Sequence, residues 1–169
     1  MIFSVSAWTA EEEGKMELEI IPSQNAPLDF DAGAIKIQYI EYCSADGTDG
    51  VVEGGAITEE VISGLLEQIP TGITMYLSLL PQCEDNWMEV ISDGTWLALG
   101  YSSECGQSNY YSYNPEFKGS EELSPLLSEG QSVIEKYLAL TDMKAGRQAV
   151  EYFIRTGKLS HNIDWARQI

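Results

Sequence analysis

Residues 86–101 read NWMEVISDGTWLALGY and have the clearest strand pattern in this chain of 169 residues. Two apolar runs lie on either side of Asp93 and Gly94, a dipeptide that favours a two-residue hairpin turn because both residues tolerate a positive φ. We therefore expect two antiparallel strands here. The segments on either side of this hairpin have strand character too.

Four further segments are predicted as strands. Residues 15–21 and 34–43 alternate between apolar and polar side chains, which is the pattern of a strand with one buried face. Residues 73–80 are apolar on both faces and indicate a buried strand, and residues 108–114 are rich in tyrosine. Residues 44–50 and 115–130 are predicted as loops, and residues 132–140 fit a strand or a helix equally.

Two segments have the apolar spacing of amphipathic helices. The first begins after Thr58, whose hydroxyl can cap a helix, and ends before Pro70. The second spans residues 142–157, with Thr141 as the expected cap and Gly157 at the expected stop.

The order of these elements favours one fold class. The strands occur in blocks and do not alternate with helices, which is typical of α+β proteins. We expect a mainly antiparallel sheet of about six strands with two principal helices. The chain has no internal repeat and no long linker, so a single domain over residues 1–169 is predicted.

The chain is strongly acidic, with a formal net charge of −18. Residues 1–135 hold 24 acidic and three basic residues, whereas residues 136–169 hold three acidic and six basic ones. Because self-repulsion costs stability, we expect the acidic surface to have a function, and a basic protein is its natural partner. Nucleic acid and anionic membranes are poor partners for it. The alternative is a surface that only keeps the protein soluble.

The sequence predicts a cytoplasmic protein. No apolar run reaches the length of a membrane span, and the start, MIFSVSAWTAEEEGK at residues 1–15, lacks the basic region of a signal peptide. Cys43, Cys83 and Cys105 cannot all pair, and their spacing fits no zinc site. We therefore expect buried, reduced thiols.

The residues that could carry catalysis favour a protein that is not an enzyme and that holds no metal and no cofactor. His161 is the one histidine and has no second ligand or nucleophile in a recognisable pattern. The glycine-rich segment 47–55 carries acidic residues and no lysine, so it would repel phosphate. Paired carboxylates such as Asp29 with Asp31 leave a small hydrolase as an alternative, which requires two carboxyl groups with raised pKa in one pocket.

Acidic residues beside tyrosine or tryptophan are the candidate contacts for a basic partner. Aromatic side chains supply rigid contact area, and the acids select the charge of the partner. The alternative for each aromatic residue is packing in the core. The candidate contact residues are Asp46, Asp49, Glu84, Asp85, Trp87, Glu104, Tyr110, Tyr111 and Tyr113.

The C-terminal segment, AGRQAVEYFIRTGKLSHNIDWARQI at residues 145–169, resembles the closing motif of the first-numbered immunity-protein family of bacterial polymorphic toxin systems. In that motif an amphipathic helix with an aromatic residue ends at Thr-Gly, and a short turn leads to a β-branched residue and a tryptophan. A proline is common in the family where this chain has LSHN, residues 159–162. The matching positions are Tyr152, Phe153, Thr156, Gly157, Ile163 and Trp165.

This resemblance implies an inhibitor that binds the C-terminal domain of a cognate toxin, a nucleic-acid (cytidine) deaminase, as one subunit of a heterodimer. Such deaminases use a zinc-bound water and grip a nucleic-acid strand, so an acidic inhibitor would be drawn to the basic groove and would block the active site. Because partners differ among family members, we expect Trp165 to pack in the core. The alternative function is an acidic mimic of nucleic acid that inhibits another enzyme.

Overall fold

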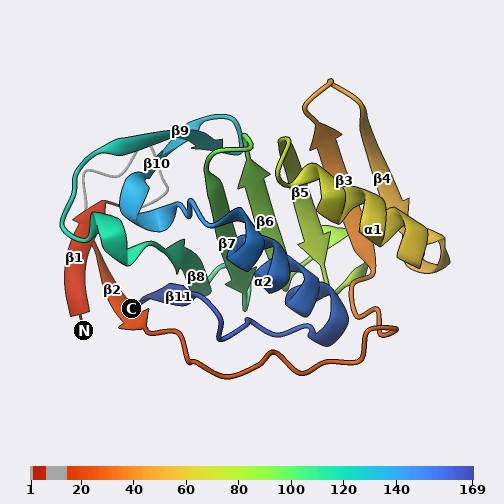
Figure 1. Ribbon diagram of the computed structural model, residues 1–169, viewed down its shortest axis with the longest axis horizontal. Helices are drawn as coiled ribbons and strands as arrows, with labels where there is room; N and C mark the ends of the chain where they lie inside the picture. Colours follow the sequence, from red (N-terminus) through yellow and green to blue (C-terminus); the bar gives the residue numbers. More distant parts are fainter. Residues whose placement is uncertain (1, 7–14) are drawn as a thin grey trace.

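The computed structural model describes residues 2–6 and 15–169, with side chains from residue 17 onward. Two α-helices lie on one face of a large antiparallel sheet (Figure 1), so the predicted α+β class is confirmed, although the main sheet has nine strands and not about six. The elements are β1 Ile2–Ser6, β2 Lys15–Ile21, β3 Tyr39–Ser44, β4 Asp49–Glu53, α1 Glu59–Gln68, β5 Ile73–Ser78, β6 Trp87–Ser92, β7 Leu97–Ser103, β8 Ser108–Tyr113, β9 Leu123–Ser128, β10 Ser132–Glu135, α2 Met143–Thr156 and β11 Asp164–Gln168.

The predicted hairpin of residues 86–101 forms β6 and β7 near the centre of the main sheet, whose order is β1-β2-β11-β8-β7-β6-β5-β3-β4. Its turn differs from the prediction, because the N–H of Asp93 donates to the carbonyl of Trp96 at 3.2 Å and the two central residues are Gly94 and Thr95. The carboxylate of Asp93 accepts a hydrogen bond from the N–H of Thr95 at 2.9 Å, and Gly94 has a φ of 89°. The aspartate thus shapes the turn, while the glycine supplies the positive φ.

The C-terminal strand β11 lies inside the sheet and not at an edge. It pairs antiparallel with β2 on one side and with β8 on the other. An internal strand is hydrogen-bonded along both sides, so this position anchors a chain end that would otherwise fray. The C-terminal resemblance predicted only a short turn before Trp165.

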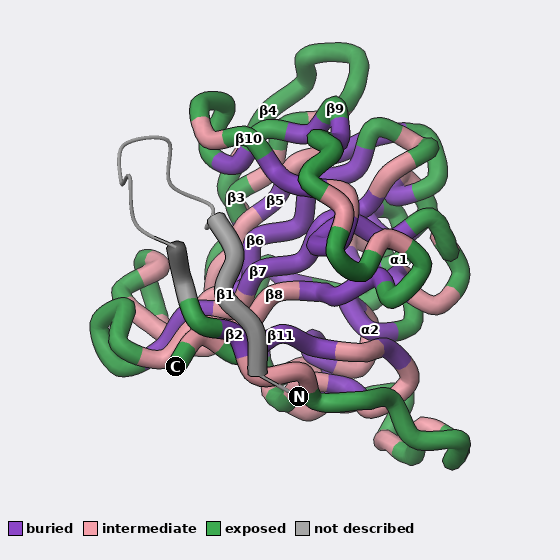
Figure 2. The backbone as a smooth tube through the Cα atoms, turned by 90° about the vertical axis from the view of Figure 1, so that its left-hand side faces the viewer, coloured by how far each residue is buried: buried purple, intermediate pink, exposed green. Residues whose placement is uncertain are grey.

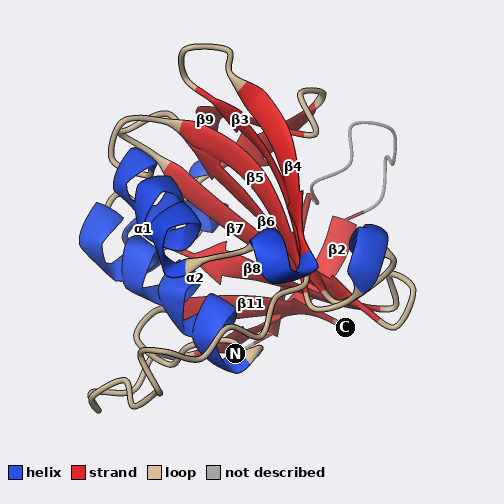
Figure 3. Cartoon of the chain, turned by 90° about the vertical axis from the view of Figure 1, so that its right-hand side faces the viewer, coloured by secondary structure: helices blue, strands red, loops and turns tan. Residues whose placement is uncertain are grey.

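Helices α1 and α2 form one layer over one face of the sheet (Figure 3). Thr58 caps α1 as predicted, since its hydroxyl accepts a hydrogen bond from the backbone N–H three residues later at 3.3 Å. The cap of α2 is Asp142 and not Thr141, because the Asp142 carboxylate accepts from the N–H of Ala145 at 3.0 Å. Gly157 ends α2 in the left-handed conformation, with a φ of 72°.

The larger core cluster fills the space between the helices and the sheet. Met75, Leu77 and Met88 from the central strands are fully buried there, and β5, β6 and β7 run as largely buried segments through the middle of Figure 2. A Cβ on Gly146 would lie 2.1 Å from the side chain of Leu97. The close approach of α2 to β7 therefore explains a glycine inside this helix.

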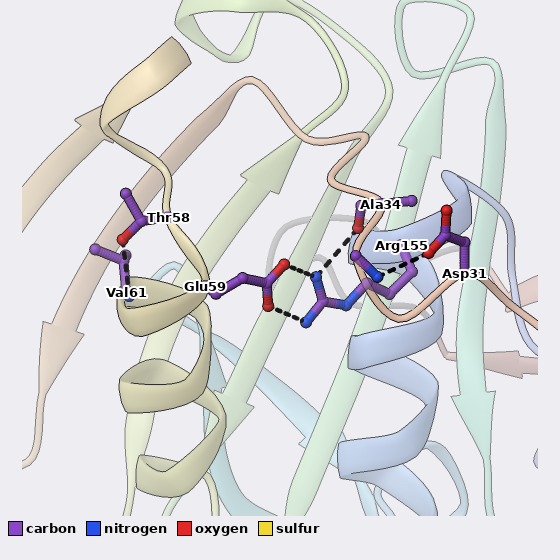
Figure 4. A network of polar contacts seen from close by, with 7 residues as sticks. Asp31, Ala34, Thr58, Glu59, Val61 and Arg155 are labelled. Carbon is purple, nitrogen blue, oxygen red and sulfur yellow. Dashed lines mark hydrogen bonds and ion pairs between the residues drawn. The ribbon is translucent and has the colours of Figure 1, made fainter.

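A buried arginine joins the two helices (Figure 4). Arg155 of α2 is 6% exposed, and its guanidinium donates two hydrogen bonds to the carboxylate of Glu59 in the first turn of α1. The same guanidinium donates to the carbonyl of Ala34 at 3.2 Å. The hydrogen bonds from Arg155 hold the pKa of Glu59 below its usual value. This two-point contact fixes the ends of the helices relative to each other.

A β-hairpin covers part of the opposite face of the sheet. It consists of β9 and β10, and the alternate residues Ser124, Leu126 and Ser128 of β9 are buried on its inner side. The prediction of a loop over residues 115–130 is therefore wrong. The signal was weak because serine occupies two of the three inward positions, while leucine and proline occupy outward ones, the reverse of the usual alternation.

The cysteines differ from the expectation of buried thiols. All three are free, but Cys43 and Cys105 are exposed and Cys83 is half-buried. Cys43 lies on a strand that the sequence predicted, yet its side chain is on the accessible side of the sheet. Burial of a cysteine in a strand therefore depends on which face of that strand is covered.

The prediction about a signal peptide rests on residues 1–15. Of these, residue 1 and residues 7–14 lie outside the described part of the chain. Among the described residues, no helix has the length and apolar character needed to cross a membrane.

Trp165 packs in the core, as the sequence predicted. It is 3% exposed and belongs to the core cluster beneath the helices. Its indole N–H donates to the carbonyl of Ser160 at 2.7 Å, so the polar end of the ring is satisfied inside the protein. Burial in the fold accounts for a tryptophan this close to the end of the chain.

Replacing Trp165 with alanine should lower the free energy of unfolding by about 3–5 kcal/mol, because the change leaves a cavity beneath α2. For a domain of this size the melting temperature should fall by roughly 10 °C. Trp165→Phe keeps a large ring and loses the hydrogen bond to Ser160, so it should cost less. Thermal unfolding followed by circular dichroism measures both variants, and equal melting temperatures for Trp165→Ala and the wild type would contradict the assignment.

Candidate protein-binding surface

The β9–β10 hairpin covers only part of its face of the sheet. Ile40 and Met75 point toward the helices, so the alternate side chains of β3 and β5 point to the opposite face. Antiparallel pairing aligns distant residues in one row across that face: Val51, Glu41, Tyr76, Glu89, Gly100 and Tyr111. We define the open sheet face as the accessible residues on β3 to β6: Tyr39, Glu41, Cys43, Asp49, Val51, Glu53, Tyr76 and Trp87.

The open sheet face is acidic. Residues 37–117, which include β3 to β8, contain 13 acidic residues and no lysine, arginine or histidine. Glu41, Asp49 and Glu53 are exposed on this face. The three ion pairs among the described residues lie elsewhere, so none of these carboxylates has a cationic partner within that part of the chain. The face therefore presents uncompensated negative charge.

A hollow of about 320 Å³ lies in this face, across β4, β3 and β5. Carboxylates, hydroxyl groups and apolar groups line it together. A long side chain with an apolar stem and a cationic end matches this mixture better than an anion does. The lining residues are Glu41, Tyr42, Cys43, Asp49, Gly50, Val51, Thr74 and Tyr76.

Aromatic rings lie beside these carboxylates. Tyr76 and Trp87 pack edge to face, with their ring centroids 5.8 Å apart. The hydroxyl of Tyr39 donates to the carboxylate of Glu41 at 3.2 Å. Rings held in this way lose little conformational freedom on binding, which is why tyrosine and tryptophan are common in protein interfaces.

A buried carboxylate marks the boundary of the open sheet face. Glu89 is 2% exposed and accepts hydrogen bonds from the hydroxyl of Tyr76 at 2.9 Å and the hydroxyl of Ser128 at 2.7 Å. The N–H of Glu129, in the β9–β10 turn, donates to the same carboxylate at 3.1 Å. Glu129 has a φ of 51°, which non-glycine residues rarely adopt. Glu89 thus links the hairpin to the sheet beside Tyr76, at the border of the open sheet face.

Burial dominates the electrostatics around Glu89. It raises the pKa of the Glu89 carboxyl, and the hydrogen bonds from Ser128, Glu129 and Tyr76 lower this pKa only in part. Burial first, and then the charge of Glu89, raise the pKa of Tyr111 to about 12 and also raise the pKa of Tyr76. The tyrosine hydroxyls therefore stay protonated at neutral pH and can act as donors.

Four of the nine predicted contact residues lie on or beside the open sheet face. Asp46 and Asp49 are exposed on the β3–β4 hairpin, and Asp49 lines the hollow. Trp87 is part of the face. Tyr111 projects from the same side of the sheet, in the row that contains Glu89.

Three predicted residues lie in loops at the end of the strands opposite the β3–β4 hairpin, next to the start of β6 at Trp87. Glu84 and Asp85 precede β6, and Glu104 lies in the β7–β8 turn. The carboxylate of Asp85 accepts a hydrogen bond from the N–H of Cys105 at 3.3 Å, so these two loops are neighbours. The structure therefore divides the predicted contacts between two ends of the sheet.

The other two tyrosines do not lie on the open sheet face. Tyr110 projects toward the helix side and lines a hollow that also includes Trp165. Tyr113 is buried in the core cluster beneath the β9–β10 hairpin. Successive strand residues point to opposite faces, so the NYYSYN segment could not place all three of its tyrosines on one surface.

The sequence missed several residues of this surface. Glu53 lies on β4, which was not predicted as a strand, and Glu41 and Tyr76 gave no sign of which face they occupy. Glu89 could have been found, because an acidic residue in the middle of a buried strand requires hydrogen-bond partners. The sequence could not identify those partners, since Ser128 lies in a segment predicted as a loop.

The carboxyl groups with a raised pKa and the histidine lie outside the hollow of this face. No group of three or more histidine, cysteine, aspartate or glutamate side chains among them is arranged to hold a metal ion. Burial raises the pKa of Glu89 and of Glu135, and neither carboxyl lines the hollow. His161 lies elsewhere, with its Nε2 atom 3.0 Å from the carbonyl oxygen of Ala26.

The fold and this surface define a class of protein: a small α+β domain with an acidic face in which carboxylates and aromatic rings are combined. No protein-family model matches the chain, and no curated protein matches it. The resemblance of residues 145–169 to an immunity-protein family therefore stays a prediction that rests on those residues.

The raised pKa of Glu89 predicts a pH-dependent contribution to stability. Between the ordinary glutamate pKa of about 4.3 and the raised value, the folded protein binds more protons than the unfolded chain. The free energy of unfolding must therefore fall as the pH rises through this window. Glu89→Gln removes this contribution. The melting temperature of the wild type should therefore exceed that of the variant by most near pH 4 and by less near pH 8, two values chosen to lie roughly on either side of the window.

Thermal unfolding of both proteins across this pH range measures the difference. Glu135 and the other titrating groups are present in both proteins, so their contributions cancel in the comparison. A difference in melting temperature that does not change with pH would contradict the assigned role of Glu89.

Proposed function

We propose that this protein is an immunity protein that binds a basic toxin domain through the open sheet face and blocks its active site. The observation that carries the proposal is the face itself, where exposed carboxylates without cationic partners lie beside rigid aromatic rings. Opposite charge steers a cationic protein to such a surface and speeds its capture. Phosphate groups are repelled by it, which disfavours nucleic acid as the partner.

The C-terminal motif supports the same function from other residues. Its Gly157 ends α2, and its Trp165 packs beneath the helices. These residues lie on the helix side of the sheet and support the fold, while the binding surface lies on the opposite side. A shared core with a separate binding face suits a family whose members inhibit different toxins.

The resemblance extends the proposal to the chemistry of the toxin. A deaminase that acts on nucleic acid needs cationic groups to hold the phosphates of its substrate. The inhibitor would cover these groups as one subunit of a heterodimer, in the cytoplasm of the cell that it protects during bacterial competition. Active-site occlusion then follows from competition for the same basic groove.

Reversing a charge on the open sheet face should slow capture of the toxin. For Glu41→Lys, the association rate constant with the toxin domain encoded beside this chain should fall by about tenfold at low salt. The wild-type rate should fall several-fold as the salt concentration is raised from about 0.05 M to about 0.5 M. Surface plasmon resonance across this range measures both effects.

Glu67→Lys is the matched control. Glu67 is exposed on α1, in the layer on the other side of the sheet, and the substitution changes the net charge by the same amount. It should alter the rate much less than Glu41→Lys. An association rate that is flat across ionic strength, or an equal loss in both variants, would count against binding through this face.

The exposed cysteines provide an independent map of the contact. Cys43 lies in the hollow of the open sheet face, and Cys105 lies in the β7–β8 turn at the other end of the strands. Formation of the complex should slow maleimide labelling of Cys43 by about tenfold or more, because the partner excludes the reagent, and should leave Cys105 unchanged. Mass spectrometry of the labelled peptides distinguishes the two sites, and protection of Cys105 alone would place the contact at the wrong end of the sheet.

A further inference from the structure

Strand β4 ends the nine-stranded sheet and borders the open sheet face (Figure 1). Among the described strands it pairs only with β3. Backbone hydrogen bonds mark both ends of this pair, from Ser44 N–H to the Thr48 carbonyl at 2.7 Å and from Gly54 N–H to the Gln38 carbonyl at 3.0 Å. These two bonds fix which backbone groups of β4 point toward β3.

The backbone groups that point away from β3 belong to Asp49, Val51 and Glu53. Hydrogen-bonded pairs alternate along an antiparallel ladder, so Gly50 and Val52 face β3 and the other three residues face the free edge. The side chains of these three residues are all exposed on the open sheet face, and Val51 is 54% exposed. The edge therefore presents unpaired backbone groups and acidic side chains together.

This edge carries two acidic side chains but lacks three other devices that stop a strand from pairing. It has no lysine, no proline and no bulge, and its register with β3 is continuous. Antiparallel pairing with a second copy of the chain about Val51 would place Asp49 opposite Glu53, and like charges directly opposite are destabilising. The same carboxylates would stabilise a strand that carries basic residues at those positions.

We infer that the basic partner adds an extended segment to β4 as a further strand of the sheet. The segment has the pattern basic–x–apolar–x–basic, which places cationic side chains beside Asp49 and Glu53 and an apolar one beside Val51. Main-chain hydrogen bonds fix its register, and the alternate side chains give specificity. The hollow at Glu41 takes the end of a long basic side chain from this strand. The inference rests on the proposed function, because the segment belongs to the toxin domain.

Val51→Pro tests the edge directly. Proline removes one outward N–H and leaves the hydrogen bonds between β4 and β3 in place. Val51→Thr keeps the N–H and the branched shape, so it is the matched control. Isothermal titration with the toxin domain encoded beside this chain should give a dissociation constant raised by about tenfold or more for Val51→Pro and changed by less than about twofold for Val51→Thr.

Amide hydrogen exchange of the wild-type complex tests the same inference without a variant. The amides of Asp49, Val51 and Glu53 should exchange about tenfold more slowly, or slower still, in the complex than in the free protein. A complex that Glu41→Lys weakens, but in which these three amides exchange as in the free protein, overturns strand addition and leaves the proposed function standing. Failure of the wild type to bind the toxin domain at low salt overturns the proposed function itself.

Discussion

Leaving the apolar side chains of either face of a nine-stranded sheet in water costs free energy. The two α-helices of this chain cover one of these faces. α1 and α2 pack side by side on that face, and the two-point contact between Arg155 and Glu59 fixes their ends. Among the described residues, the other face is covered in part by the β9–β10 hairpin and by the segment that follows it, residues 136–139. The part of the sheet beyond the hairpin must therefore meet solvent or another molecule, and its side chains are polar, acidic and aromatic as that position requires.

Glu89 connects the core to this exposed surface. Its carboxylate is buried, so it needs hydrogen-bond donors, and it takes them from Tyr76 on the open sheet face and from Ser128 and Glu129 on the hairpin. One side chain thus holds the hairpin in place and orients the ring of Tyr76 on the open sheet face. A change at this position would alter both the stability of the hairpin and the shape of the surface next to it.

Charge is distributed unevenly between the two faces of the sheet. The strands from β3 to β8 carry acidic residues without basic ones, whereas residues 136–169 carry six basic residues and include α2 on the other face of the sheet. An approaching cationic protein therefore meets attraction on one side and weaker attraction or repulsion on the other. Such asymmetry orients an encounter before contact is made, which raises the fraction of collisions that lead to binding.

Short stretches of sequence were enough to predict the elements whose signal is local. The hairpin at residues 86–101, the cap at Thr58 and the stop at Gly157 follow from turn chemistry and capping within short windows, whereas the burial of Trp165 was expected from the resemblance of the C-terminal segment. Which side of each strand is covered depends on how the whole chain packs. This packing placed Tyr110 toward the helices, Tyr113 in the core, and Glu41, Glu53 and Val51 on the open sheet face. Side chains alternate between the two faces of a strand, and the strand's own sequence does not settle which face is buried. Burial depends on the hydrogen-bonded neighbours and covering layers, which come from distant parts of the chain.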